Sequence, residues 1–153
     1  MMRSYGITPL MAEEVGPAYA MVRALYPGIG LEAWRAFARP LVGVSRPEGP
    51  AIVGMRTEDG YLCGLFAYRL EGDFHHERIL VVDPIAVLDL IDAEPAIRSM
   101  MAAIESTAAR LHCGATRVGV RGAHAALRKL LADAGYAPEV TIFTKPGLRV
   151  GKA

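Results

Sequence analysis

Residues 77–91 read ERILVVDPIAVLDLI and are apolar on both faces of an extended chain. This pattern is typical of a central β-strand, because a strand that is buried on both faces has no side turned toward water. Asp83 and Pro84 interrupt the run. Proline donates no hydrogen bond to a neighbouring strand, so we predict a β-bulge or a sharp bend at this point. Such a strand needs other elements packed against both faces of its sheet.

The segments around this strand alternate between extended and helical patterns. The most regular is 93–112, where apolar residues recur at helical spacing and form one core-facing stripe. The predicted elements, in chain order, are a strand at 4–8, helices at 12–26 and 31–38, strands at 51–57, 61–72 and 77–91, a helix at 93–112, a strand at 115–121, a helix at 124–135 and a strand at 139–145. We therefore expect a single α/β domain over 1–147, followed by a polar tail over 148–153.

The composition excludes several classes of protein. The chain of 153 residues carries 17 basic and 16 acidic side chains, and no basic run suggests contact with nucleic acid. Cys63 and Cys113 lie in apolar contexts and are expected to be reduced. The N-terminus lacks the apolar region of a signal peptide, and no apolar run is long enough to span a bilayer. We therefore expect a soluble cytoplasmic protein with neither nucleic acid nor membrane as a partner.

Two stretches carry a family resemblance. HAALRKLLADAGYAPEVTIFTK (124–145) combines a helix ending in Gly135-Tyr136 with a strand, and AAIESTAARLHCGATRVGV (102–120) passes from helix to strand. With the order of elements, these stretches resemble the GNAT superfamily of N-acetyltransferases. The resemblance implies a GNAT-like fold, a mixed and mostly antiparallel sheet that is splayed at its centre and has helices on both faces. It also implies transfer of an acyl group from acetyl-CoA or another acyl-CoA to a small-molecule or peptide amine, without a metal; a homodimer stays open.

The resemblance fails at the loop that binds the CoA pyrophosphate. The family pattern, Arg/Gln-x-x-Gly-x-Gly/Ala, aligns here with 92–97, which contains no glycine. Such a loop must offer exposed N–H groups and a positive potential. Here it holds the carboxylates of Asp92 and Glu94, and Pro95 has no N–H to offer. We predict instead that Asp92 caps the helix that follows, with Pro95 in its first turn.

The resemblance still indicates where CoA would lie, along the end of the long strand and the start of the next helix. The residues that it implies are Ala86, Val87, Leu88, Asp89, Leu90, Ile97 and Arg98. Arg98 is the only basic residue near this junction, so it is the one cation that could reach a phosphate.

A second departure concerns the catalytic acid. Many members of the family use a tyrosine in the last helix to protonate the CoA thiolate, and the matching position here is Leu131, on a core stripe with Leu127 and Leu130. Leucine cannot donate a proton. The alternative function is therefore a catalytically silent GNAT-like domain that binds a metabolite or a protein partner.

The most polar cluster is DFHHER at 73–78, just before the long strand. The family often places a general base at this position, so the resemblance implies Glu77, with His76 as second choice because its pKa lies near neutrality. The alternative is an exposed turn that merely tolerates polar residues. A metal site on Asp73, His75 and His76 is disfavoured, because adjacent side chains on a strand point to opposite faces.

Asp83 and Asp89 stand in an otherwise apolar strand, and buried carboxylates are costly unless they are paired. Asp83 is our third catalytic candidate, because in the GNAT layout a bulge here opens the cleft that admits the acyl-pantetheine arm. The alternative is that both aspartates bond to local backbone. For the acceptor pocket the resemblance implies Tyr26, Trp34 and Phe37, whose helical spacing is equally typical of core packing.

Overall fold

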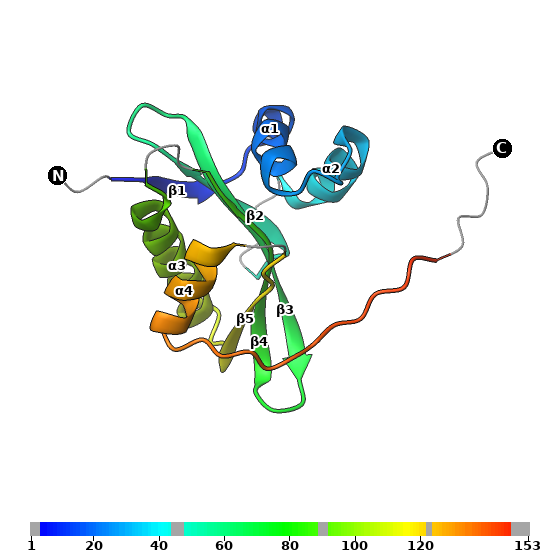
Figure 1. The fold of residues 1–153 in the computed structure, drawn as a ribbon, viewed down its shortest axis with the longest axis vertical. Helices are drawn as coiled ribbons and strands as arrows, with labels where there is room; N and C mark the ends of the chain where they lie inside the picture. The colour runs from blue at the N-terminus through cyan, green and yellow to red at the C-terminus, as the bar shows by residue number, and fades with distance from the viewer. Residues whose placement is uncertain (1–3, 44–47, 89–91, 122–123, 148–153) are drawn as a thin grey trace.

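The structure, a computed structural model, describes residues 4–43, 48–88, 92–121 and 124–147. Its five strands form one sheet in the order β1-β2-β3-β4-β5, antiparallel except for the parallel pair β4–β5 (Figure 1). The strands are β1 (Gly6–Pro9), β2 (Ala51–Arg56), β3 (Leu62–Asp73), β4 (Glu77–Val87) and β5 (Ala115–Val118). The helices are α1 (Val15–Leu25), α2 (Leu31–Ala38), α3 (Ala93–Arg110) and α4 (Ala125–Asp133), with short 3-10 turns at Ala12–Glu14 and Arg39–Leu41.

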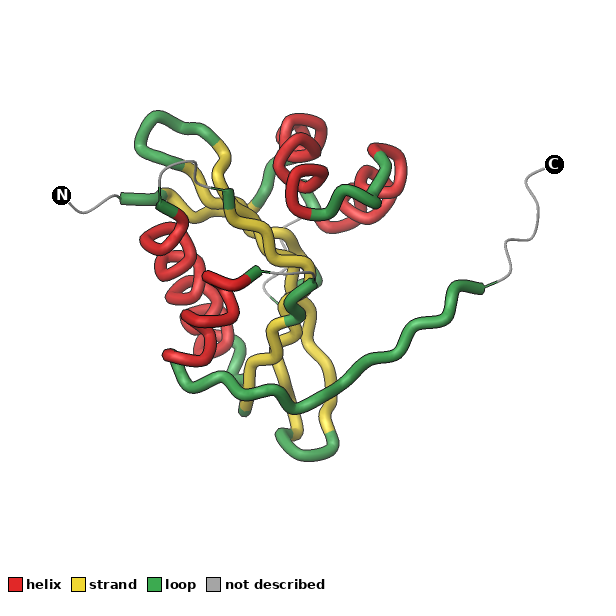
Figure 2. The backbone as a smooth tube through the Cα atoms, viewed as in Figure 1, coloured by secondary structure: helices red, strands yellow, loops and turns green. Residues whose placement is uncertain are grey.

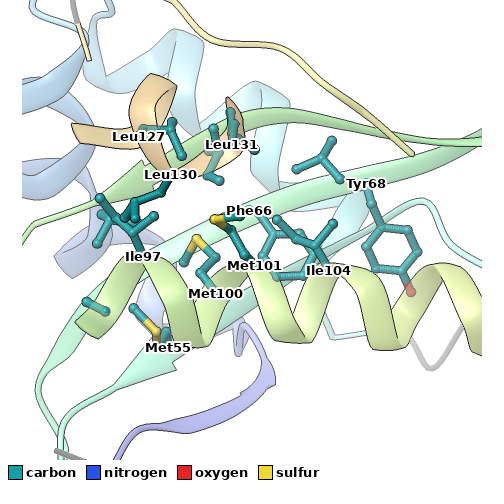
Figure 3. Packing of buried hydrophobic residues seen from close by; sticks show 14 of the residues in the cluster. Met55, Phe66, Tyr68, Ile97, Met100, Met101, Ile104, Leu127, Leu130 and Leu131 are labelled. Atoms are coloured by element: carbon teal, nitrogen blue, oxygen red, sulfur yellow. The ribbon is translucent and has the colours of Figure 1, made fainter. Parts of the chain in front are cut away.

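Helices cover both faces of the sheet, which confirms the predicted architecture (Figure 2). On one face, α3 and α4 pack their apolar stripes against β2, β3 and β4. Figure 3 shows Met100 and Ile104 of α3 and Leu130 of α4 beside Phe66 of β3. On the other face, α1 and α2 pack around Trp34. The two methionines of the α3 stripe are therefore core filler, as their spacing suggests.

The predicted bulge lies in β4. Phe66 pairs with Ile85 and Tyr68 pairs with Val82, so β4 has one more residue than β3 between the same two pairs. The extra residue changes which side chains of β4 face α3: even-numbered residues do so before the bulge and odd-numbered residues after it. Leu80 and Val82 belong to the α3 side before the bulge, and Ile85 belongs to that side after it. Asp83 and Pro84 are thus the residues at which β4 changes its course.

The ends of the helices follow the local chemistry of the sequence. Asp92 accepts a hydrogen bond from the Glu94 N–H at 3.0 Å and caps α3, and Pro95 lies in the first turn, so both predictions are confirmed. After α4, Gly135 adopts a φ of 93°, a conformation that glycine tolerates best, and the Tyr136 N–H then bonds to Leu131.

Two elements differ from the sequence prediction. The strand expected at 139–145 does not form; residues 137–147 are extended, exposed and unpaired with any described strand. β5 ends at Val118 rather than at 121, since β4 turns away from it after Val82. β4 is described as far as Val87. Predictions that fall on 89–91 and on the tail 148–153 lie outside the described residues, and the domain boundaries stay a prediction.

Candidate functional site

The sheet opens where β4 leaves β5. The two strands pair only over Ile79–Val82 and Ala115–Val118, and the Gly119 N–H donates the last bond to Val82 at 2.9 Å. A Cβ at Gly119 would lie 3.1 Å from Cγ of Asp83, so the absence of a side chain lets the carboxylate approach the diverging chain. The bulge and this glycine together produce the centrally splayed sheet that was predicted.

An ion pair spans this opening. Nε and Nη2 of Arg121 donate to the two carboxylate oxygens of Asp83 at 2.9 and 2.7 Å. Such a two-point geometry fixes both groups more firmly than a single contact does. The Asp83 side chain is 23 % exposed and that of Arg121 is 64 % exposed, so the pair faces solvent on one side. The hydrogen bonds from Arg121 to Asp83, together with the negative charge of Asp83, raise the pKa of Arg121 above its ordinary value.

Tyr26 reaches the same opening from the end of α1. Its side chain is buried, and its hydroxyl donates to the carbonyl oxygen of Ile85 at 2.5 Å. Burial raises the pKa of Tyr26 above the ordinary value of 10.0; the charge on Asp83 also raises it, while the Ile85 bond and the Arg121 charge lower it. Tyr26 therefore holds its proton at neutral pH. Tyr26, Asp83, Ile85, Gly119 and Arg121 form what we call the cleft site.

The other two predicted catalytic residues lie elsewhere. Glu77 begins β4 and pairs with Asp73 across the β3–β4 turn. The run from Glu77 to Asp83 spans about 20 Å at the usual rise of about 3.3 Å per residue, so the two carboxylates cannot act on one substrate atom. His76 lies beside Glu77, and its Nε2 is 3.1 Å from Oε2 of Glu139. The structure thus separates Asp83 from Glu77 and His76.

A network of ion pairs surrounds that turn. Asp73 accepts hydrogen bonds from Arg117 at 3.0 Å and from the N–H groups of His75 and His76 at 3.1 Å. The bond from Arg117 is the main cause that lowers the pKa of Asp73. Ligand atoms of Asp73, His76 and Glu139 lie within 4.8 Å of one another, a spacing that could suit a metal ion. Arg117, 3.7 Å from Glu139, already supplies the compensating cation there. That no metal is required stays a prediction.

Of the five described residues that were expected to bind CoA, three are buried. Ala86, Val87 and Ile97 lie in the core. Leu88 is exposed, and its N–H donates to Cys63 at 2.8 Å. Asp89 and Leu90 lie outside the described residues.

The start of α3 offers little to a phosphate. Oε1 of Glu94 accepts from Nε and Nη2 of Arg98 at 3.0 and 2.8 Å, so the cation expected to reach a phosphate is already paired. The N–H of Glu94 is likewise used by Asp92. Any CoA that binds here must displace these contacts or pass beside them, and the CoA-binding roles stay predictions.

The three aromatic residues predicted to bind the acceptor lie in different places. Trp34 is buried, and its Nε1–H donates to the Val15 carbonyl at 2.7 Å, which joins α2 to α1. Phe37 is partly exposed, with its ring 6.2 Å from that of Trp34. Only Tyr26 reaches the cleft site. The binding roles of all three stay predictions.

A cavity of about 600 Å³ runs along β5 and includes part of the cleft site. Asp83 and Arg121 line it from the sheet, Arg128 and Leu131 from α4, and Ile142 from the C-terminal segment. Sequence reasoning missed Arg121, although it ends the run ATRVGVR, because its partner lies 38 residues away. Leu131 is buried as predicted, so the usual tyrosine position supplies no proton donor.

Comparisons with known proteins place the fold. The sequence matches no profile of a known protein family and no curated protein. Solved structures do match. The aminoglycoside N-acetyltransferase AAC(6')-Iy, solved with CoA, aligns with a TM-score of 0.76 at 14% identity, covering 94% of this chain and 95% of that one. The 6'-N-acetyltransferase AAC(6')-Ih from Acinetobacter baumannii gives 0.72 at 11% identity, with coverage of 95% and 99%.

A ribosomal-protein-alanine N-acetyltransferase from Brucella melitensis biovar Abortus 2308 also aligns, with a TM-score of 0.70 at 14% identity over 94% of this chain and 100% of that one. The chain therefore has the fold of the GNAT acetyltransferases, as the resemblance implied. Among the described residues, no helix combines the length and the apolar character needed to cross a membrane.

Proposed function

We propose that this protein is a divergent GNAT-like acyltransferase that moves an acyl group from acyl-CoA to the amine of a small molecule or a peptide. The observation that carries the proposal is the cleft site. The sheet parts at Asp83, in the region that admits the acyl-pantetheine arm in the GNAT layout, and the Tyr26 hydroxyl bonds to Ile85, two residues further along the same strand. Coverage of nearly the full length of CoA-binding acetyltransferases supports the same assignment.

The cleft site contains the two groups that the reaction needs. The amine nitrogen attacks the thioester carbonyl, the C–S bond breaks, and the amine loses a proton while the thiolate gains one. Asp83 is the group that accepts the proton of the amine. Tyr26 is the group that protonates the thiolate, in place of the tyrosine that Leu131 replaces. Arg121 positions Asp83 through its two hydrogen bonds.

A second candidate function rests on a different observation. The start of α3 is closed by Asp92 and by the Glu94–Arg98 pair, and α4 presents Leu131 to the core. These features favour a catalytically silent domain that keeps the fold and binds a metabolite or a protein partner without transferring an acyl group.

Calorimetric titration with acetyl-CoA separates the two candidates. Binding at a hundredfold excess over the dissociation constant also adds about 2.7 kcal/mol to the free energy of unfolding, which a thermal shift detects. Release of free thiol in the presence of amines, including aminoglycosides and N-terminal peptides, then reports turnover. Absence of binding at millimolar acetyl-CoA would reject the acyltransferase and leave the silent domain.

The role of the cleft site is tested with two tyrosine variants. Tyr26→Phe removes the proposed proton donor and is expected to reduce kcat at least tenfold while leaving acetyl-CoA binding in place. Tyr19→Phe is the matched control, because the Tyr19 hydroxyl makes a similar bond, 2.9 Å long, to the Ile29 carbonyl away from the cleft. Equal turnover by both variants would remove Tyr26 from the mechanism.

A further inference from the structure

A second cavity, which we call the β1 cavity, lies at the β1 edge of the sheet, at the opposite end from the cleft site. Its volume is about 580 Å³. Small-molecule sites usually have volumes of about 300–1,000 Å³. The side chains of Ile7, Ala51, Val53 and Ala103 form an apolar wall between β1, β2 and α3. The cavity is therefore large enough, and apolar enough, to hold a small molecule.

Tyr68 of β3 places a hydroxyl group at the β1 cavity. Its residue is only 6 % exposed and is one of those that line the cavity. Figure 3 shows the ring beside α3, with its oxygen directed toward that helix. The hydroxyl groups of Tyr19 and Tyr26 each bond to a carbonyl oxygen, but no described residue forms a hydrogen bond with the Tyr68 hydroxyl. No side-chain oxygen of the described residues is both fully buried and without a partner, so this oxygen reaches the open space of the cavity.

The ring of Tyr68 is held firmly on its other sides. A Cβ at Gly49 would lie 2.7 Å from Cε2 of Tyr68, so only a residue without a side chain can approach the ring edge so closely. The ring of Phe66 lies 6.3 Å away on the same strand. A buried tyrosine usually gives its hydroxyl a hydrogen-bond partner, and phenylalanine would fill the same space without this requirement. The hydroxyl therefore indicates a partner that enters the cavity.

The other polar groups of the wall come mainly from the last turns of α3. They belong to Ser106, Thr107 and Arg110. Among the described residues that line the cavity, Arg110 alone carries a charge, and none is acidic. A cation in the last turn of a helix also suits the helix dipole, so Arg110 by itself would not indicate a ligand. Together with the Tyr68 hydroxyl, it gives one wall of the cavity two donors and a single positive charge.

We propose that the β1 cavity binds a small carboxylic acid with an apolar body. The carboxylate accepts a hydrogen bond from the Tyr68 hydroxyl and pairs with the guanidinium group of Arg110. The apolar body lies against Ile7, Ala51 and Val53. A singly charged anion matches a wall that carries one cation and no acidic side chain among its described residues. The site lies apart from the cleft site, so the proposal does not depend on binding of CoA or on acyl transfer.

Nuclear magnetic resonance titration of the isotope-labelled full chain tests the site. The probes are 4-phenylbutyrate and octanoate, each compared with its amide, which has nearly the same shape and no charge. We expect both carboxylates at millimolar concentration to shift the backbone amide signals of 51–53 and 103–110 and to leave those of 119–121 in place. The amides should bind about tenfold more weakly, because they lose the charged partner. Signals of the β1 cavity that do not respond to either carboxylate, or amides that bind equally tightly, would overturn the proposal.

An arginine variant tests the assigned cation. Arg110→Gln should remove the difference in affinity between each carboxylate and its amide. Arg23→Gln is the matched control, because Arg23 occupies the last turn of α1 and is not among the residues that line the β1 cavity. It should keep the full difference. A carboxylate preference that survives in Arg110→Gln would contradict the proposed ion pair.

A tyrosine variant tests the hydroxyl. Tyr68→Phe should weaken binding of both carboxylates about tenfold while keeping the Tm of the parent, because the hydroxyl bonds to no described residue. Tyr19→Phe is the control and should bind both probes as the parent does. Unchanged binding by Tyr68→Phe would show that the hydroxyl contacts only water, which would overturn the proposal. A lower Tm of Tyr68→Phe would do the same, because the hydroxyl would then have a bond within the folded chain.

Discussion

The Tyr26 hydroxyl and the Ile85 carbonyl oxygen lie 2.5 Å apart, although 59 residues separate them in the chain. The bond ties the end of α1 to β4 directly after its bulge. β5 pairs with β4 only as far as Val82, so β5 cannot supply a hydrogen bond to the Ile85 carbonyl in place of Tyr26. The same hydroxyl thus stabilises the splayed part of the sheet and is the group that we propose as proton donor.

Tyr26→Phe should destabilise the fold by about 1–3 kcal/mol, because it leaves a buried carbonyl without the bond that compensates its desolvation. Urea unfolding at neutral pH measures the change. Tyr19→Phe should cost less, since Tyr19 is only half-buried and water can replace the lost bond. Equal losses would mean that the Ile85 carbonyl finds another partner.

Glu14 gives the fold a dependence on pH. Its carboxylate forms two hydrogen bonds with Arg56, one of them 2.9 Å long, and these lower its pKa from the ordinary value of 4.5. Because the folded-state pKa is the lower one, the pair stabilises the fold above pH 4.5, and this stabilisation disappears as pH falls through the lowered value. Glu14→Gln should therefore be less stable than the parent at pH 7.

The stability difference should shrink as pH falls below 4.5 and through the lowered pKa of Glu14, where the parent also loses the charge on this side chain. Chemical unfolding at a series of pH values measures it. Glu13→Gln is the control, because Glu13 is the exposed neighbour on the same turn and should change stability little at any pH. A Glu14→Gln effect that stays constant from pH 7 to pH 3 would contradict the assignment.

Gly114 should not tolerate a side chain. A Cβ there would lie 2.7 Å from the His76 carbonyl oxygen, a rigid backbone atom, and the Gly114 N–H already donates to Arg78 at 2.8 Å. We expect Gly114→Ala to cost about 1–3 kcal/mol, the usual range for overpacking. Gly16→Ala is the control, because Gly16 lies in α1 with open space around it, and it should be neutral or stabilising by up to about 1 kcal/mol. Both are read from urea unfolding.

The elements that sequence reasoning located correctly are those with local signals. The stripe of α3, the cap at Asp92 and the turn at Gly135 depend on residues within a few positions of each other. The bulge at Asp83 was also predictable, because proline breaks a strand locally. The strand expected at 139–145 was wrong, because alternation shows that a segment can pair with a sheet and does not show that it does so.

The candidate site, too, could be predicted only in part from the sequence. Its carboxylate, Asp83, was recognisable as an anomaly in an apolar strand. Its cation, Arg121, comes from a register between distant strands that no local pattern encodes. The separation of Glu77 from Asp83 was available from the sequence, because the rise of a strand fixes how far apart two of its residues lie.

The cap of α3 leads to the last prediction. Asp92→Ala removes the acceptor of the Glu94 N–H and should lower the free energy of unfolding by about 1 kcal/mol, whereas Asp92→Asn keeps an acceptor and should stay close to the parent. Both variants remove a negative charge from the helix end that CoA phosphates would approach, so both should bind CoA more tightly than the parent does. Urea unfolding and calorimetric titration with CoA, run on the same three proteins, separate the two effects. If CoA instead binds through the carboxylate of Asp92, both variants will bind it more weakly, and the acidic start of α3 is then a working part of the site.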